Sequence, residues 1–208
     1  MFKGLASIGL LMIATLHAQQ PSEAELNKLA AYMDKALGLH QGISVADVGT
    51  GLAVRHPIRI AREVAPGGKV VCVEVRQSAV DSIRQAVDAQ HVSNVGVVLG
   101  KDDDPGLAPR AFDAILLSNV YHEFTQPEPM LRHIREALKP DGRLVILENY
   151  SVAGRSDSPA DQAKRHDMAP ETLEREIAAA GFVVKERIEP VLVSSPDRLR
   201  YLVRAQTR

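Results

Sequence analysis

The sequence predicts a single α/β domain built on a seven-stranded, mostly parallel β-sheet with helices on both faces and a C-terminal antiparallel hairpin. Five short runs are apolar throughout and alternate with helical stretches, which is the composition of strands that helices cover on both sides. Only a short turn separates the last two apolar runs, so we expect them to pair as antiparallel neighbours at one edge of the sheet. A length of 208 residues suits one domain with a full core.

The predicted elements follow one another in a regular order. An amphipathic helix comes first, and Ser22 and Glu25 form a capping-box pair at its start. Pro57 suits the first turn of the next helix, and Gly181 is expected to end the last helix in a left-handed conformation. The predicted strands cover 43–49, 69–75, 95–100, 112–119, 143–149, 182–193 and 199–206, and the helical stretches cover 21–39, 57–68, 78–90, 128–142 and 168–182.

Composition and charge argue against nucleic acid as a partner. The net charge is -1 and the chain has no Trp, so neither a basic stripe nor one common base-stacking side chain is present. The single cysteine, Cys72, stands in the apolar run "KVVCVEV" and is expected to be a buried core thiol. An internal disulfide is excluded.

The first 18 residues are typical of a secretory signal peptide. Lys3 precedes an apolar run from Leu5 to Leu16, and Ala18 stands before a polar Gln-Gln-Pro. The alternatives are a retained membrane anchor or an N-terminal core helix. We therefore expect a leader over 1–18, one domain over 19–208, and a periplasmic or secreted location, with a membrane-anchored or cytoplasmic protein as the alternative. Membrane contact is expected only through 1–18, if these residues are retained.

A glycine turn follows the first predicted strand in "SVADVGTGLAVRH". Gly49 and Gly51 let the backbone approach a ligand closely, and the start of the next helix offers free N–H groups. A dinucleotide fingerprint requires a third glycine where Val54 stands, so binding of NAD is disfavoured. Asp47 sets a carboxylate against the turn, which favours a ligand that carries an amino group and no phosphate.

These segments resemble the class I S-adenosylmethionine-dependent methyltransferases, especially the small-molecule group that includes ubiquinone and menaquinone biosynthesis enzymes. The stretch "VADVGTG" is similar to the first motif of the family, and "FDAILLSNVYHEF" and "ALKPDGRLVILEN" are similar to its later motifs. The resemblance implies a Rossmann-like fold and S-adenosyl-L-methionine as cofactor. It also implies that Glu74 binds both ribose hydroxyls, that Val75 lies against the adenine, and that Asp102 or Asp103 accepts from the adenine amino group.

The sequence departs from the family pattern at two positions. Ala53 stands where the family has its third glycine, and Lys101 stands at the first acidic position of the adenine segment. Ala53 is expected to reshape the methionine end of the pocket, and Lys101 is expected to weaken cofactor binding without abolishing it.

Candidate catalytic residues follow the fourth predicted strand, at the edge of the sheet where ligands bind. His122 is the first candidate for a general base, because histidine titrates near neutral pH. Its alternative role is to cap a short helix or to bond the sheet. Tyr121 shares that edge, and Asn119 is a candidate for cofactor binding or for fixing the turn. No metal site is expected, since "HEF" lacks the second histidine of a zinc motif.

Two further features each have two possible roles. Glu148 is interpreted either as a ligand for an acceptor amine or as a salt-bridge partner of Arg143 or Arg155. The polar stretch 149–168 follows the fifth strand, so it either covers the site and brings His166 to it or forms a mobile surface loop.

The sequence therefore predicts an enzyme, an S-adenosylmethionine-dependent methyltransferase that acts on a small-molecule acceptor. The alternative is a non-catalytic binding protein that keeps the fold with a degenerate cofactor site, and an NAD-linked reductase is the least favoured interpretation.

Overall fold

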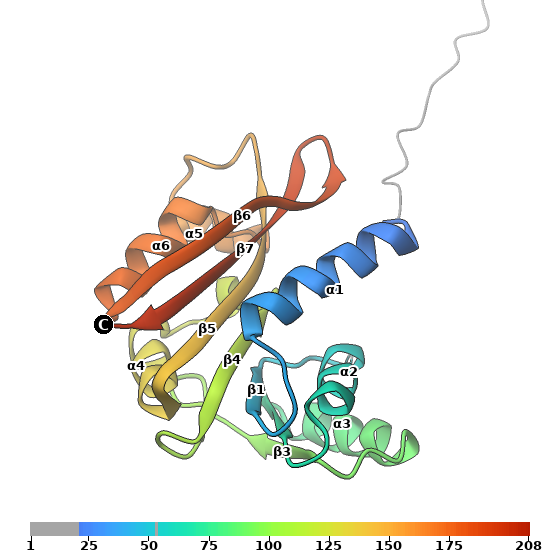
Figure 1. The fold of residues 1–208 in the computed structure, drawn as a ribbon. Helices are drawn as coiled ribbons and strands as arrows, with labels where there is room; N and C mark the ends of the chain where they lie inside the picture. The colour runs from blue at the N-terminus through green and yellow to red at the C-terminus, as the bar shows by residue number, and fades with distance from the viewer. Residues whose placement is uncertain (1–20, 53) are drawn as a thin grey trace, which may run out of the picture.

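The protein folds as three layers, with a central β-sheet between two layers of helices (Figure 1). The structure is a computed structural model and describes residues 21–52 and 54–208. The predicted leader at 1–18 and the family departure at Ala53 lie outside the described residues.

The sheet has seven strands in the order β3-β2-β1-β4-β5-β7-β6. All neighbours from β3 to β5 pair in parallel, whereas β7 runs antiparallel to both β5 and β6. This confirms the mostly parallel sheet and the C-terminal hairpin at its edge. The strands are β1 (Ser44–Val48), β2 (Lys69–Glu74), β3 (Val95–Leu99), β4 (Phe112–Ser118), β5 (Leu138–Ser151), β6 (Phe182–Ser195) and β7 (Arg198–Thr207).

Helices cover both faces of the sheet, as the apolar strands predict. The helices α1 and α2 share one core with Val45, Leu116 and Leu202, and α3 packs beside them on Cys72. The helices α4 and α6 close the opposite face (Figure 1). The helices are α1 (Glu23–Leu37), α2 (Arg55–Val64), α3 (Gln77–Ala89), α4 (Pro127–Ala137), α5 (Pro159–Lys164) and α6 (Pro170–Ala179), and a 3-10 helix, η1 (Tyr121–Glu123), follows β4.

The local signals in the sequence take the predicted forms. Ser22 and Glu25 make the complete capping box of α1, and Gly181 has a φ of 89° after α6. Cys72 is fully buried. The largest difference in boundaries lies at 138–142, which was predicted to continue the helix. The helix α4 ends at Ala137, and β5 begins at Leu138, which pairs with Phe112 ahead of a bulge. The short helices η1 and α5 were not predicted.

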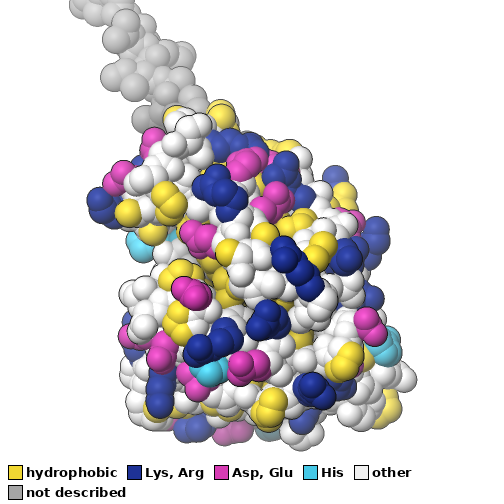
Figure 2. Space-filling view, turned by 90° about the vertical axis from the view of Figure 1, so that its left-hand side faces the viewer, with side chains coloured by type: hydrophobic (Ala, Val, Ile, Leu, Met, Phe, Trp, Pro, Cys, Tyr) yellow, Lys and Arg dark blue, Asp and Glu magenta, His cyan; other side chains and the backbone are white. Residues whose placement is uncertain are grey.

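Acidic and basic side chains alternate over the face seen in Figure 2, and no expanse of a single charge gathers there. Within the described part of the chain, no helix has both the length and the apolar character that a membrane span requires.

Candidate active site

A cavity of about 400 Å³ opens at the carboxyl ends of β1, β2 and β4. Parallel α/β sheets bind their ligands at this edge, because the loops that leave the strands converge there. Predicted site residues line it at six positions: Gly49, Gly51, Glu74, Val75, Asp102 and Asn119. Six further residues line it and were not predicted from the sequence: Thr50, Arg76, Pro105, Glu123, Phe124 and Met130.

The glycine turn forms the floor of this cavity. Gly49 and Gly51 have φ values of 72° and 67°, a region that L side chains rarely adopt. A Cβ atom on Gly49 would overlap the side chain of Val120, whereas the space beside Gly51 is open. Gly49 therefore allows the turn to pack closely against the loop that carries Val120, and Gly51 leaves room for a ligand.

Glu74 ends β2 and joins the turn to the cavity. Its Oε1 accepts a 2.6 Å hydrogen bond from the Gly51 N–H, and its Oε2 accepts from the Val75 N–H at 3.2 Å. The residue is 7% exposed, so its carboxylate is fixed at the wall of the cavity. A carboxylate held in this way can accept hydrogen bonds from a diol.

Asp47 lies beneath the turn at the end of β1. It is 3% exposed, and its Oδ1 has no hydrogen-bond partner among the described residues. Burial raises its pKa to about 7, against the effect of the hydrogen bond from the Thr50 side chain and with a further contribution from the negative charge of Glu74. A positively charged ligand above the turn would stabilise the ionised form of this carboxyl group.

The buried pair His122 and Glu148 is the main polar feature beside the cavity. Imidazole Nδ1 lies 3.0 Å from Oε2 and 3.2 Å from Oε1 of Glu148, and the Tyr121 N–H donates to Oε1 at 2.7 Å. Burial lowers the pKa of His122, but the hydrogen bond to Glu148 and the surrounding negative charges outweigh it and raise the pKa overall. Glu148 pairs with neither Arg143 nor Arg155, so the salt-bridge interpretation is wrong.

Tyr121 takes a different position from the one its predicted catalytic role requires. Its hydroxyl donates a 2.7 Å hydrogen bond to Glu176 of α6, and its ring is buried. Burial and the contact with Glu176 raise the pKa of this hydroxyl well above its usual range. Tyr121 and His122 line a second, smaller pocket of about 180 Å³, and Phe124 lines both cavities.

The other predicted site residues divide between the wall of the cavity and its surroundings. Asn119 lines the cavity with a φ of 56°, and its Oδ1 accepts from the side-chain amide of Asn149. Lys101 and Asp102 both line the cavity, and Asp103 does not. The acidic position that Lys101 replaces is therefore followed at once by an acidic side chain at the same wall.

The polar stretch after β5 packs on η1 and is held by hydrogen bonds. Gln162, which is 1% exposed, donates to the carbonyl oxygens of Arg155 and Asp157 and accepts from the Ala169 N–H. The rings of His122 and His166 lie edge to face, with 5.3 Å between their centroids. The stretch thus covers η1 and the small pocket and brings His166 to His122, whereas none of its residues lines the large cavity.

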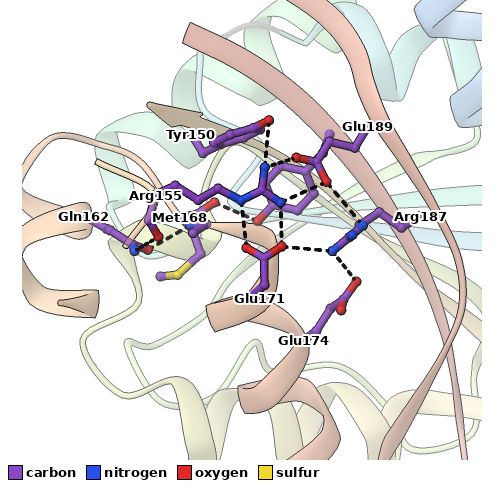
Figure 3. A network of polar contacts seen from close by, with 10 residues as sticks. Tyr150, Arg155, Gln162, Met168, Glu171, Glu174, Arg187 and Glu189 are labelled. Carbon is purple, nitrogen blue, oxygen red and sulfur yellow. Dashed lines mark hydrogen bonds and ion pairs between the residues drawn. The ribbon is translucent and has the colours of Figure 1, made fainter. Parts of the chain in front are cut away.

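A charge network ties this stretch to α6 and the hairpin (Figure 3). Arg155 pairs with Glu171 of α6 and, at 2.6 Å, with Glu189 of β6. Arg187 of β6 pairs with both of these carboxylates and with Glu174. The network fixes the start of the covering stretch to two neighbouring elements.

S-adenosylmethionine fits the residues that the structure brings together. The cavity has a volume within the range of small-molecule sites, which is about 300 to 1,000 Å³. Asp47 supplies an unpartnered buried carboxylate oxygen, Gly51 leaves open space, and Glu74 presents a fixed carboxylate. Asp47 and the turn would hold the amino-acid end, and Glu74 would hold the ribose.

The known proteins to which the chain is similar are methyltransferases. Residues 47–144 match a family model described as "Methyltransferase domain". The ubiquinone/menaquinone biosynthesis C-methyltransferase UbiE of Hahella chejuensis is 29% identical over 119 residues, which are 56% of this chain and 46% of the relative. The chain spans about half the length of the curated relatives that it matches.

Solved structures share the fold. A SAM-dependent methyltransferase from Aquifex aeolicus has a TM-score of 0.73 at 22% identity, covering 89% of this chain and 93% of its own. A geranyl diphosphate C-methyltransferase from Streptomyces coelicolor, solved with S-adenosyl-L-homocysteine, has a TM-score of 0.68 at 14% identity and covers 91% and 85%. Residues 47–144 are therefore similar to a methyltransferase domain, and the chain shares the fold of solved S-adenosylmethionine-dependent methyltransferases.

Proposed function

We propose that the protein transfers a methyl group from S-adenosylmethionine to a small organic acceptor. The observation that carries this proposal is the meeting of the Gly49–Gly51 turn and the fixed Glu74 at one cavity, with the buried Asp47 directly before the turn. When bound, the cofactor supplies a methyl group on a sulfonium, which is a good leaving group. The chain then mainly has to align the donor and the acceptor, and alignment alone can contribute about 7 to 11 kcal/mol.

His122 is the catalytic residue that we propose on the acceptor side, and it acts through Nε2. Glu148, a carboxylate that only accepts hydrogen bonds, faces Nδ1, so in the neutral ring the proton lies on Nδ1 and Nε2 has the lone pair. The adjoining residue Glu123 and the following Phe124 line the large cavity, which supports an acceptor position next to the ring. Tyr121 was the second candidate, and we propose that it positions η1 through its hydrogen bond to Glu176.

The direct test is calorimetric titration of the purified chain with S-adenosylhomocysteine. Binding at one site with a micromolar dissociation constant supports the proposal. Absence of heat and of any thermal shift at millimolar ligand would overturn it and favour the non-catalytic alternative, in which Lys101 and Ala53 have made the cofactor site degenerate.

We also propose that residues 1–18 are a leader that directs the protein to the periplasm or the medium, which rests on the sequence pattern alone. N-terminal sequencing of protein from fractionated cells tests this. A mature chain that begins near residue 19 supports it, and an intact Met1 in the cytoplasmic fraction contradicts it.

A further inference from the structure

Three side chains with metal-binding atoms meet beside the candidate active site. His122 and Glu123 come from η1, and His166 comes from the end of the covering stretch. One ligand atom from each lies within 4.8 Å of the other two, and across residues 21–52 and 54–208 no other His, Cys, Asp or Glu side chains gather in this way.

The orientation of His122 is that of a metal ligand. Its Nδ1 is held by Glu148, and its Nε2 lies 3.8 Å from Oε1 of Glu123. Histidines that bind metals usually donate their other ring N–H to a carboxylate, which fixes the ring and makes the free nitrogen a better ligand. Glu148 is fully buried, so it can perform this task without competing for the ion.

The other two ligands, Glu123 and His166, have exposed side chains, and hydrogen bonds hold the backbone of His166. Arg198 donates to the carbonyl oxygen of His166 at 3.1 Å, and the His166 N–H donates to Ala163 at 2.9 Å. The side chains of Glu123 and His166 are exposed. Bonds of about 2.0 to 2.2 Å in a tetrahedral site place ligand atoms about 3.3 to 3.6 Å apart, so small side-chain rotations would close the present separations.

We propose that His122 Nε2, His166 and the Glu123 carboxylate bind one divalent transition-metal ion of the Zn²⁺ type. Two imidazoles and one carboxylate suit such an ion, and three protein ligands leave a coordination position open. Glu123 lines the large cavity and His122 the small pocket, so the open position lies where the two approach each other. A metal-bound Nε2 has no lone pair left for a proton, so a bound ion would replace His122 in activating the acceptor, by accepting an acceptor oxygen at its open position. That role rests on the proposed function, whereas metal binding itself does not.

The test is competition for Zn²⁺ between a chromophoric chelator and the metal-free full-length chain. We expect one equivalent bound with a submicromolar dissociation constant, and at least a tenfold loss of affinity in His166→Ala and in Glu123→Ala. His133→Ala is the matched control, because His133 and Glu136 form a surface histidine–glutamate pair at 3.5 Å without a third ligand. Its affinity should equal that of the unmodified chain.

Two results would overturn the proposal. One is the absence of submicromolar binding, and the other is equal loss of affinity in His133→Ala and His166→Ala. A spectrum of the Co²⁺-loaded chain gives a second readout, since tetrahedral ligation by His and Glu should produce visible absorption that His166→Ala abolishes. Titration of His166→Ala with S-adenosylhomocysteine keeps the two proposals separate, because His166 does not line the large cavity and its loss should leave cofactor binding unchanged.

Discussion

The backbone N–H of Gly51 donates a 2.6 Å hydrogen bond to Oε1 of Glu74, so one carboxylate joins the glycine turn after β1 to the end of β2. These two residues are 23 positions apart in the sequence. The contact fixes the turn to the end of β2 and orients the carboxylate toward the cavity. Cofactor binding should therefore depend on this side chain more than on any single residue of the turn.

Replacement of Glu74 by Gln should weaken binding of S-adenosylhomocysteine about 10- to 100-fold. The amide can still accept from Gly51, but it loses the charged hydrogen bonds to the ligand, each of which contributes about 1.5 to 3 kcal/mol. Calorimetric titration measures the change. Glu63→Gln on the exposed side of α2 is the control and should bind normally. Unchanged affinity in Glu74→Gln would remove Glu74 from the site.

Replacement of Asp47 by Asn should stabilise the cofactor-free protein above about pH 7. Burial raises the pKa of Asp47 to about 7, so between about pH 4 and 7 the folded state binds a proton that the unfolded state has lost. The free energy of unfolding therefore falls as the pH rises through this range, by at most a few kcal/mol, and Asp47→Asn should lack this decline. The same variant should bind S-adenosylmethionine more weakly.

Urea unfolding at pH 5, 6.5 and 8 without cofactor checks this prediction, with the exposed Asp88→Asn as the control. Identical pH profiles for Asp47→Asn and Asp88→Asn would show that Asp47 carries no linked proton.

Replacement of Gly49 by Ala should cost about 2 to 4 kcal/mol in stability. The positive φ contributes about 1 to 2 kcal/mol, and the overlap with Val120 contributes the rest. Gly42→Ala separates the two causes, because Gly42 also has a positive φ and has no neighbour within 4 Å of an added Cβ. Thermal or urea unfolding should rank Gly49→Ala as the more damaging change, and adding Val120→Ala should recover part of the loss.

Replacement of Arg155 by Met should loosen the covering stretch while the sheet stays intact. Arg155 is half-buried between Glu171 and Glu189, and its loss leaves Glu189 with only Arg187. We expect amide hydrogen exchange in residues 152–168 to accelerate at least tenfold and global stability to fall by about 1 to 2 kcal/mol. Lys164→Met removes an exposed pair with Asp161 and should change neither quantity. Equal exchange rates in both variants would contradict this role.

The sheet could be predicted because its signals are local. Apolar runs define buried strands, the Ser22 and Glu25 pair caps α1, and Gly181 ends α6 with a positive φ. The glycine turn could be predicted for a similar reason, since parallel strands bring their carboxyl ends to one edge. Glu74 was implied by the resemblance to the methyltransferase family.

The surroundings of His122 could not be predicted in this way. His166 reaches the ring across 44 positions of sequence, because the buried amide of Gln162 fixes the path of the covering stretch. The partners of Glu148 were also missed, since the interpretation considered arginines and overlooked His122 and the backbone N–H groups of Tyr121 and Asn149. Such contacts depend on how the loops pack, and neither the periodicity nor the spacing of residues in the sequence predicts loop packing.

The irregular pairing of β6 has a consequence for self-association. Its register with β7 shifts at three places, and the strand carries Pro190, which has no N–H to donate, beside the charged Lys185 and Arg187. A strand of another molecule that approached this edge would meet an interrupted row of hydrogen-bonding groups. It would also have to displace water from the charged side chains. The edge is thereby protected against intermolecular strand addition, the first step of amyloid-like aggregation.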